Sequence, residues 1–323
     1  MVKNLKEVFA KFKDEATCRQ FLIKQRWNGK PVCPYCGAEK HYVIENGKRF
    51  KCANNTCYKK FSVTVGTVFE ASNIPLTTWF PAMYIISAHK KGISSVQLAK
   101  DLGVTQKTAW FMLHRIRESL KEDHPDMLTG IVEVDETYMA RKYRTKYKGL
   151  SPEMVAKIDL EQSHQHKLNM GAVIGVKQRD GNIIVRAAER ANADAILKVV
   201  QANVSPDVRL MTDESKKYRK IFKEYNRQSV QHNKKEWVRG EVHVNGVENF
   251  WSVMKRGIYG IYHQISYKHL QRYCDEFSYR YNSRKINDGQ RFELSLKGIE
   301  GRLTYKTLVH GEGSKEVNTG QKD

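Results

Sequence analysis

The stretch IVEVDET, at residues 131–137, predicts a β-strand in which apolar residues lead into acidic ones. The stretch VRLMTDE, at residues 208–214, repeats this pattern. Because acids at the carboxyl ends of adjacent strands meet at one edge of a sheet, Asp135 and Asp213 are expected to lie close together. Their repulsion is costly unless a cation lies between them, so the pair predicts a divalent metal site. The alternative for Asp213, which precedes Ser215 and a predicted helix, is a helix cap.

A third acid lies on a helix predicted within residues 243–256, HVNGVENFWSVMKR. Helical spacing places polar residues on one face and apolar residues on the other: Asn245, Glu248, Ser252 and Lys255 against Val247, Phe250, Trp251 and Met254. Glu248 would complete a cage for two ions, and its hard oxygen ligands suit Mg²⁺ or Mn²⁺. Such ions activate a water or a 3′-hydroxyl in phosphoryl transfer, and Lys255 is expected to hold a phosphate.

The residues around these acids alternate between strand and helix patterns. Strands are predicted at residues 130–134, 168–177, 183–188, 208–212 and 229–232, and helices near residues 193–203, 215–224, 244–258 and 267–284. This order indicates a mixed α/β domain, in which the turn Asp180-Gly181 closes a hairpin. The basic segment 141–148 has no periodicity and is predicted to be a loop. Glu136 and Glu214 follow the two aspartates directly and are expected to point to the opposite side.

Four of the six cysteines form two close pairs, Cys33-Pro-Tyr-Cys36 and Cys52-Ala-Asn-Asn-Thr-Cys57. Four thiolates in two knuckles can enclose one tetrahedral Zn²⁺, and the short β-like runs around them favour a zinc ribbon. Such a site is closed, so its role is to fold a small segment and not to catalyse a reaction. The isolated Cys18 and Cys274 lie on apolar helical faces and are expected in the core.

Residues 94–110 read SSVQLAKDLGVTQKTAW and predict a helix-turn-helix, with Gly103 in the turn. The polar side chains that open the second helix would face base edges and phosphates: Thr105, Gln106, Lys107 and Thr108. Arg115 is expected to reach the DNA backbone. The alternative is a plain helical hairpin, which shares this pattern.

The charge balance favours a polyanionic partner. The 323 residues hold 56 Lys and Arg against 35 Asp and Glu, a formal charge of +21. Forty per cent hydrophobic residues are enough for packed cores and exclude global disorder. Because there is no signal-peptide pattern and no apolar run of about 18 residues, a cytoplasmic protein without a membrane partner is expected.

The combined pattern resembles the DDE transposases of bacterial insertion sequences that carry a zinc ribbon and are related to the eukaryotic Merlin elements. The resemblance rests on the ribbon, the helix-turn-helix, the motifs Val-Asp-Glu-Thr and Thr-Asp-Glu, and the run NGVENFWSVMKRG that contains Glu248 and Lys255. It covers about residues 15 to 300. It implies a ribonuclease-H-like catalytic domain in which Asp135, Asp213 and Glu248 hold two Mg²⁺ ions. In this family the third acid is sometimes Asn, so Asn245 is an alternative ligand.

The resemblance also implies the partners and the reaction. The protein is expected to bind terminal inverted repeats, cleave double-stranded DNA with Mg²⁺ and join the freed 3′-hydroxyl to target DNA. Two ends must be held together, so a homo-oligomer is expected, and DNA binding implies association with the nucleoid. His232 is a further candidate contact to metal or phosphate, although a structural role is the plainer interpretation.

Four regions follow from the patterns. These are residues 1–70 with helices and the zinc ribbon, 71–123 with the helix-turn-helix, 124–305 with the catalytic domain, and 306–323 as a flexible tail. Two rival functions remain open at this point. One is a transcription regulator with an inactive α/β scaffold, and the other is a structure-selective nuclease that does not join strands.

Overall fold

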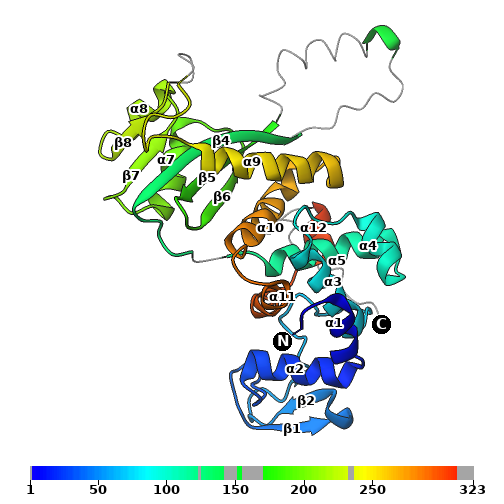
Figure 1. Cartoon of the computed structure of the whole chain (residues 1–323). Helices are drawn as coiled ribbons and strands as arrows, with labels where there is room; N and C mark the ends of the chain where they lie inside the picture. Colours follow the sequence, from blue (N-terminus) through cyan, green and yellow to red (C-terminus); the bar gives the residue numbers. More distant parts are fainter. Residues whose placement is uncertain (1, 123–124, 142–150, 155–169, 232–235, 311–323) are drawn as a thin grey trace. The chain divides into compact units, whose positions relative to one another are not determined.

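The computed structural model describes residues 2–122, 125–141, 151–154, 170–231 and 236–310. The chain divides into two compact units (Figure 1). Unit 1 holds the described residues of 1–89, 93–120 and 286–323, and unit 2 holds those of 90–92 and 121–285. His232 and most of the basic segment 141–148 lie outside the described residues, so their predicted roles stay predictions.

Unit 1 combines a small sheet with several helices. Its elements are α1 (Leu5–Lys11), α2 (Glu15–Trp27), β1 (His41–Ile44), η1 (Glu45–Gly47), β2 (Arg49–Cys52), β3 (Lys60–Phe61), α3 (Leu76–Ala88), α4 (Ser95–Leu102), α5 (Gln106–Ser119), α11 (Asp288–Lys297) and α12 (Tyr305–His310). The strands form an antiparallel sheet in the order β1-β2-β3. The helices and the ribbon strands predicted within residues 1–70, and the helices of the predicted helix-turn-helix, are therefore present.

Helix α3 is the centre of unit 1, because most of its residues are buried. Helices α1, α2, α5 and α11 all pack against it. The ring of Phe80 on α3 lies with its centroid 4.7 Å from that of Phe12 and 6.0 Å from that of Phe292 on α11. Edge-to-face aromatic contacts of this kind tie segments that are far apart in sequence into one core.

The last described segment differs from its sequence pattern in two ways. Helix α11, which opens with a capping box at Asn287, was not among the predicted elements, and it belongs to unit 1 although the predicted catalytic region extends to residue 305. Helix α12 occupies the start of the predicted flexible tail, where Leu308 is buried. Residues 311–323 lie outside the described part of the chain.

The predicted helix-turn-helix is formed by α4 and α5. Helix α4 ends at Gly103, whose backbone φ of 64° is the left-handed conformation that favours glycine. Thr105 then caps α5, because its side chain accepts a hydrogen bond from the backbone N–H of Thr108. The two helices pack against each other and against α3.

Unit 2 is a mixed α/β domain. Its elements are β4 (Ile131–Arg141), β5 (Met170–Gln178), β6 (Ile183–Ala188), α7 (Ala193–Asn203), β7 (Arg209–Thr212), α8 (Lys216–Ile221), β8 (Asn226–Ser229), α9 (Asn245–Gly257), η3 (Ile258–Tyr262), η4 (Tyr267–His269) and α10 (Leu270–Asn282). The strand order is β6-β5-β4-β7-β8. Strands β4, β5 and β6 are antiparallel neighbours, whereas β7 and β8 run parallel to β4. This is the sheet of the ribonuclease-H-like fold, as the family resemblance implies.

Helices cover both faces of the five-stranded sheet (Figure 1). Apolar residues of α7 and α8 pack on one face, where Val132 and Val134 of β4 are buried. Apolar residues of α9 and α10 pack on the other face, with Met139 of β4 among them. Because side chains alternate along a strand, Glu133 and Asp135 lie on the same face as Met139 and therefore face the α9 layer.

Four strands of unit 2 can be compared in detail with their sequence patterns. The hairpin between β5 and β6 closes at Asp180, whose φ is 57°, as the Asp180-Gly181 turn predicts. Strand β4 is longer than the predicted segment 130–134, and β8 begins three residues before the predicted segment 229–232.

Among the described residues, no helix is both long enough and apolar enough to cross a bilayer.

Candidate active site

The four paired cysteines gather as the zinc ribbon requires. The sulfur atoms of Cys33, Cys36, Cys52 and Cys57 all lie within 4.8 Å of one another. The Sγ atoms are 3.8 Å apart for Cys33 and Cys57 and 3.5 Å apart for Cys36 and Cys52. Tetrahedral zinc with Zn–S bonds of about 2.3 Å needs sulfurs separated by about 3.8 Å, so the cluster fits one Zn²⁺. The predicted cluster of four cysteines is confirmed, and it supports a structural zinc ion.

The other two cysteines lie in the cores, as predicted. Cys18 on α2 and Cys274 on α10 are both fully buried. Burial raises the pKa of the Cys18 thiol to about 12. Both side chains therefore behave as small apolar groups and not as metal ligands.

Asp135 and Asp213 lie near the end of the parallel pairing of β4 with β7. The last recorded pair is Glu133 with Met211; Asp135 lies two residues further along β4, and Asp213 directly follows β7. The negative charge of Asp213 acts on the carboxyl of Asp135. The prediction that both acids follow a strand end is wrong for Asp135, because β4 continues to pair with β5 as far as Arg141. The two acids therefore lie close enough to interact electrostatically, beside the end of the short β7.

Asp213 makes a local contact just before α8, but it does not cap that helix as the alternative interpretation predicts: the N-cap residue is Ser215, and no side chain makes a capping hydrogen bond there. Its Oδ1 atom accepts a hydrogen bond of 2.9 Å from the backbone N–H of Ser215, just before α8. This contact fixes the side chain of Asp213 beside the sheet. Since a carboxylate has two oxygens and several lone pairs, this contact and a ligand role are compatible.

The pKa of Asp135 shows the electrostatic cost of burying this carboxyl near other acids. Burial, together with the negative charges of Glu136 and Asp213, raises the pKa of the Asp135 carboxyl from 3.8 to about 7, against the effect of hydrogen bonds from the Glu136 backbone and Trp251. A cation bound between the acids would remove this cost, and the oxygen donors suit Mg²⁺ or Mn²⁺. The residues present therefore fit a divalent metal site on chemical grounds.

This raised pKa predicts how the stability of the metal-free protein depends on pH. Folded Asp135 keeps its proton up to about pH 7, whereas it ionises near pH 3.8 in the unfolded chain, so the folded state binds more protons between these values. Stability contributed by this group is therefore present below pH 4 and lost as the pH rises to 7. In a buffer without Mg²⁺ that leaves the ribbon zinc bound, we expect the melting temperature of wild type to fall relative to that of Asp135→Asn across this window and then to level off. A difference that is constant from pH 4 to 8 would contradict the raised pKa.

Helix α9 carries the third predicted acid and is anchored to Asp135. The indole Nε1 of Trp251 donates a hydrogen bond of 3.0 Å to Asp135 Oδ2. Gly175, the partner of Asp135 on β5, makes room for this indole, because a Cβ there would lie 2.7 Å from a Trp251 ring atom. Glu248 is half-buried and lies one turn before Trp251 on α9. The helix faces are as predicted, with Val247 and Trp251 on the buried side.

The three acids are more spread out than the cysteines. Among the described residues, the cysteine cluster is the only group of three or more potential ligands whose ligand atoms all lie within 4.8 Å of one another. The carboxylate oxygens of Asp135, Asp213 and Glu248 do not form such a group. A site for two ions about 3.5–4 Å apart distributes its ligands more widely than a single-ion site does. Asn245 is exposed at the first turn of α9, and Lys255 is half-buried near its end.

Two residues near this site were missed by the sequence reasoning. Glu133 is buried and accepts a hydrogen bond from the backbone of α9, and Trp251 was assigned only to the buried face of the helix. The sequence signal that could have found Glu133 is its position two residues before Asp135, because residues two apart in a strand lie on the same side. Glu136 lies on the opposite face of β4, as predicted, and is hydrogen-bonded by Lys217 and Tyr218.

The helix-turn-helix presents most of its predicted DNA contacts at the surface. Thr105, Gln106 and Lys107 are exposed and Thr108 is half-buried. The hydroxyls of Thr105 and Thr108 lie 2.8 Å apart, and Gln106 donates to the Ser95 hydroxyl at 2.8 Å. The Lys107 ammonium lies 5.2 Å from the centre of the Tyr305 ring. These contacts orient the first turn of α5.

Arg115, in contrast, is buried inside unit 1, which contradicts its predicted contact with the DNA backbone. Its exposed fraction is 3%, and its Nη2 atom donates to the carbonyl oxygen of Glu70 at 2.5 Å. The guanidinium carbon lies 5.4 Å from the ring centres of Trp79 and of Phe111. The side chain therefore serves the packing of unit 1, because helical spacing places position 115 on the core face of α5.

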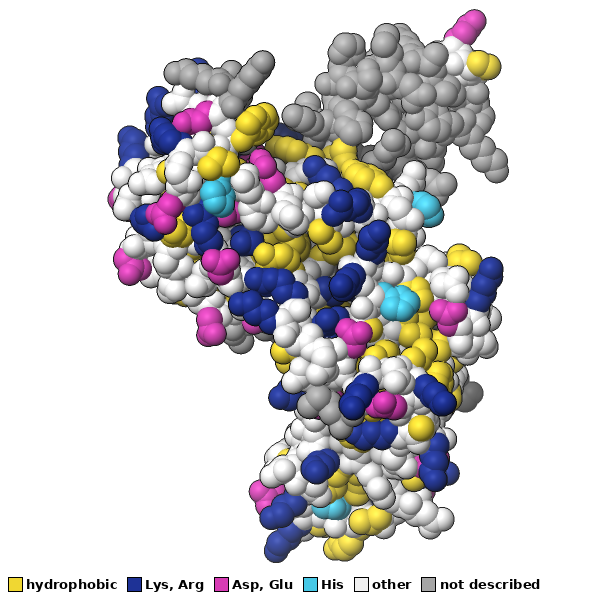
Figure 2. Space-filling view, in the orientation of Figure 1, with side chains coloured by type: hydrophobic (Ala, Val, Ile, Leu, Met, Phe, Trp, Pro, Cys, Tyr) yellow, Lys and Arg dark blue, Asp and Glu magenta, His cyan; other side chains and the backbone are white. Residues whose placement is uncertain are grey.

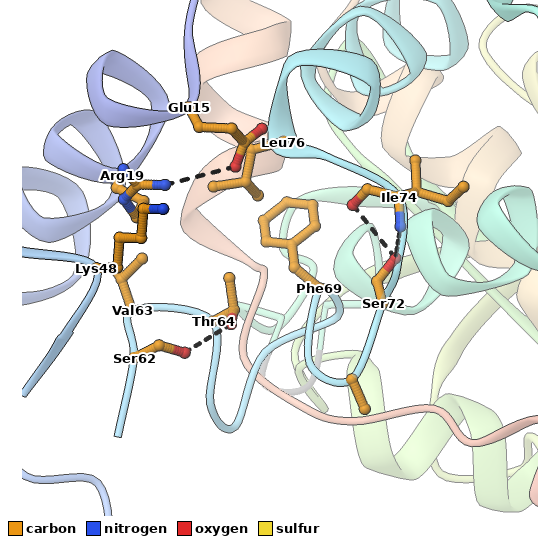
Figure 3. Close-up of a pocket in the computed structure, with 11 residues that line it drawn as sticks. Glu15, Arg19, Lys48, Ser62, Val63, Thr64, Phe69, Ser72, Ile74 and Leu76 are labelled. Carbon is orange, nitrogen blue, oxygen red and sulfur yellow. Dashed lines mark hydrogen bonds and ion pairs between the residues drawn. The ribbon is translucent and has the colours of Figure 1, made fainter. Parts of the chain in front are cut away.

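A pocket in unit 1 lies apart from all of these residues (Figure 3). It has a volume of about 230 Å³ and is lined by residues of α2, the ribbon and the segment before α3, including Phe69. Its polar groups bind one another, since Arg19 pairs with Glu15 at 3.7 Å and the Ser62 and Thr64 hydroxyls lie 2.8 Å apart. Groups that are already paired in this way do not converge on a ligand.

The surface carries the excess positive charge that the composition predicts. Figure 2 shows Lys and Arg side chains spread over the displayed faces of both units, with fewer Asp and Glu among them. Long basic side chains at a surface attract a polyanion without reading its sequence.

Comparisons with known proteins give the family of the chain. Residues 127–282, which all lie in unit 2, match a family model described as ISXO2-like transposase domain, and residues 13–60 match a transposase zinc-ribbon domain. An uncharacterised protein in transposable element ISH50 of Halobacterium salinarum is 27% identical over 259 residues, which cover 76% of this chain and 83% of that protein. A cryo-EM structure of a simian T-cell lymphotropic virus intasome, in complex with the PP2A regulatory subunit B56 gamma, matches with 12% identity and a TM-score of 0.25 over 71% of this chain and 74% of that one.

The matched ranges of the two family models include the cysteine cluster and the three candidate acids. The zinc-ribbon match includes all four clustered cysteines, and the transposase match includes Asp135, Asp213 and Glu248. Together the matched ranges cover more than half of the chain. The chain therefore belongs to the ISXO2-like DDE transposases that carry a zinc ribbon.

Proposed function

We propose that this transposase binds the terminal inverted repeats of an insertion sequence, cleaves DNA there with Mg²⁺, and joins the freed 3′-hydroxyl to target DNA. The observation that supports the proposal is the parallel pairing of β4 with β7, which ends two residues before Asp135 and Asp213, together with the effect of the Asp213 charge on Asp135. Helix α9 is fixed to Asp135 through Trp251 and brings Glu248 from a third element. In this proposal, acids from β4, from the residue after β7 and from α9 supply the oxygen ligands that such a reaction needs.

Each residue has a distinct task in this proposal. Asp135 and Asp213 would bind the metal ions from the side of the sheet, and Glu248 would bind them from α9. Bound Mg²⁺ would lower the pKa of the attacking water or 3′-hydroxyl and neutralise charge on the leaving oxygen. Lys255 lies two turns after Glu248 on the same helix, where its ammonium can hold a DNA phosphate.

DNA binding is assigned to the helix-turn-helix and the basic surface. The first turn of α5 would enter the major groove with Thr105, Gln106, Lys107 and Thr108. Both ends of the element must be held during the reaction, so we propose that the protein acts as a homo-oligomer on double-stranded DNA. Its charge of +21 supports a large electrostatic part of the affinity.

Incubation with labelled DNA that carries the ends of the element tests the proposal. With Mg²⁺ we expect nicks at the end boundaries and joined products, and with EDTA we expect specific binding without nicks. Specific binding without nicks under both conditions would contradict the enzyme and favour the transcription regulator. Metal-dependent nicks that never lead to joined products would favour the structure-selective nuclease.

The salt dependence of end binding tests the assignment of α5. If Lys107 contacts a phosphate, Lys107→Ala should reduce the slope of log affinity against log salt by about one. Lys100 on α4 is an exposed lysine outside the predicted contact set, so Lys100→Ala serves as the matched control and should keep the wild-type slope. Equal slopes for wild type and both variants, measured by fluorescence anisotropy, would remove Lys107 from the interface.

A further inference from the structure

Helix α9 begins without a cap from its own neighbourhood. The residue at its N-cap position is Val244, and no side chain there makes a capping hydrogen bond. The backbone N–H of Val247 in the first turn instead donates to Glu133 Oε2, at 2.9 Å, from a strand 114 residues earlier in the chain. A carboxylate at a helix N-terminus is favourable because it meets free N–H groups and the positive end of the helix dipole. The start of α9 is thus set by β4.

The same carboxylate also holds the segment that leads into α9. Glu133 has an exposed fraction of 1%, and its Oε1 atom accepts from Arg179 Nη2 at 3.2 Å and lies 3.6 Å from His243 Nδ1. Arg179 in turn donates to the backbone carbonyls of Glu241, at 2.8 Å, and His243, at 3.2 Å. Glu133 and Arg179 therefore tie residues 241–243 to the sheet.

Close packing at Gly246 shows how tightly α9 is seated on this pair of strands. A Cβ at Gly246 would lie 2.7 Å from Glu133 Oε2 and 2.7 Å from Lys177 Nζ. Lys177 is the cross-strand partner of Glu133 on β5 and is also buried. A side chain at position 246 would therefore push the helix away from the sheet or displace the carboxylate.

Helix α9 is consequently fixed at two points with Glu248 between them. Val247 is held by Glu133, and Trp251 is held by Asp135. We propose that Glu133 is a positioning residue, which holds α9 so that Glu248 reaches the metal site formed with Asp135 and Asp213. This inference rests on the proposed function, because it assumes that the three acids bind metal. Residues that orient metal ligands typically change metal affinity about 10–100-fold when they are substituted.

Terbium luminescence gives a test that does not depend on activity. Tb³⁺ prefers hard oxygen ligands, and Trp251 lies within hydrogen-bonding distance of Asp135, so its excitation should sensitise a bound ion. The dissociation constant of Tb³⁺ is measured with the full-length protein well below the melting temperature, and the signal of Asp135→Asn is subtracted. We expect Glu133→Gln to weaken Tb³⁺ binding about 10–100-fold. An unchanged dissociation constant would overturn the positioning role.

Two controls separate positioning from general loss of stability. Glu276 is another fully buried carboxylate of unit 2, paired with Arg280, so Glu276→Gln should lower the melting temperature but keep Tb³⁺ affinity. Gly246→Ala tests the same packing of α9 against Glu133 from the side of the helix. This variant replaces Glu133→Gln in the experiment if Glu133→Gln does not fold. It should weaken Tb³⁺ binding, whereas Gly260→Ala, where a Cβ meets open space, should not. Equal affinities in the two glycine variants would contradict the inference.

The wild-type signal distinguishes this inference from the proposed function. If wild type shows no Tb³⁺ luminescence above Asp135→Asn, the metal site itself is wrong, and the inference falls with it. If wild type binds Tb³⁺ and Glu133→Gln binds it equally well, the metal site stands and only the role of Glu133 is wrong.

Discussion

We expect the Asp135→Asn variant to lose DNA cleavage by at least about 10³-fold while it stays folded and binds DNA ends normally. The amide is nearly the same size as the carboxylate but carries no charge to hold a divalent ion. Removing a ligand of this kind forfeits several kcal/mol of transition-state stabilisation, and each 1.4 kcal/mol corresponds to about a tenfold change in rate. Nicking of labelled end DNA at saturating Mg²⁺ measures the effect.

A matched control excludes a general effect of replacing Asp by Asn. Asp180 is exposed in the β5–β6 turn with a φ of 57°, a conformation that Asn also tolerates. Asp180→Asn should therefore cleave as wild type does. If Asp135→Asn cleaves DNA at the wild-type rate, the assignment of the catalytic centre to the end of β7 is wrong.

The second large effect is expected at the zinc ribbon. Cys33→Ser should lose zinc and unfold the ribbon, because two of the four fully packed residues of its small core are themselves the ligands Cys33 and Cys52. Structural zinc contributes about 10–16 kcal/mol to the folding of small zinc domains, far more than three short strands can supply by packing. Zinc content should fall from one ion per chain to nearly none, and a protease should cut within residues 33–61.

Cys18 supplies the control for the loss of a cysteine. It is buried on α2, in the same unit, but lies outside the cluster of ligands. Cys18→Ala should keep one zinc ion per chain and resist the protease as wild type does. Full zinc content in Cys33→Ser, measured by atomic absorption, would show that the four cysteines do not form the metal site.

Local patterns predicted most of the elements and the metal ligands that lie close in sequence. Within each pair, a short turn separates the two cysteines, so the spacing of the cysteines alone predicted the cluster. Asp135 and Asp213 could be paired because each follows an apolar run, even though β4 turned out to pass beyond Asp135. The end of a strand depends on the length of the strands beside it. Strand β4 continues past the end of β7 because it still pairs with β5 there.

Contacts between distant segments could not be read in the same way. Glu133 caps α9 across 114 residues, and Gly175 matters only because Trp251 packs over it. Arg115 has the residue type of a DNA contact, but its position on α5 faces the core of unit 1, where Trp79 and Phe111 surround it. Such roles depend on which faces meet in the fold, and one sequence without its structure does not contain that information in local form.

Iron-directed cleavage of the polypeptide tests the central claim most directly, because it locates a metal site without relying on activity. The zinc-loaded protein is incubated with Fe²⁺, ascorbate and peroxide, and the cuts are mapped by mass spectrometry. If Asp135, Asp213 and Glu248 form one site, cuts should cluster near these three positions, and excess Mg²⁺ should suppress all of them together. Cuts near only one of the three positions, or cuts that Mg²⁺ does not suppress, would contradict a shared metal site.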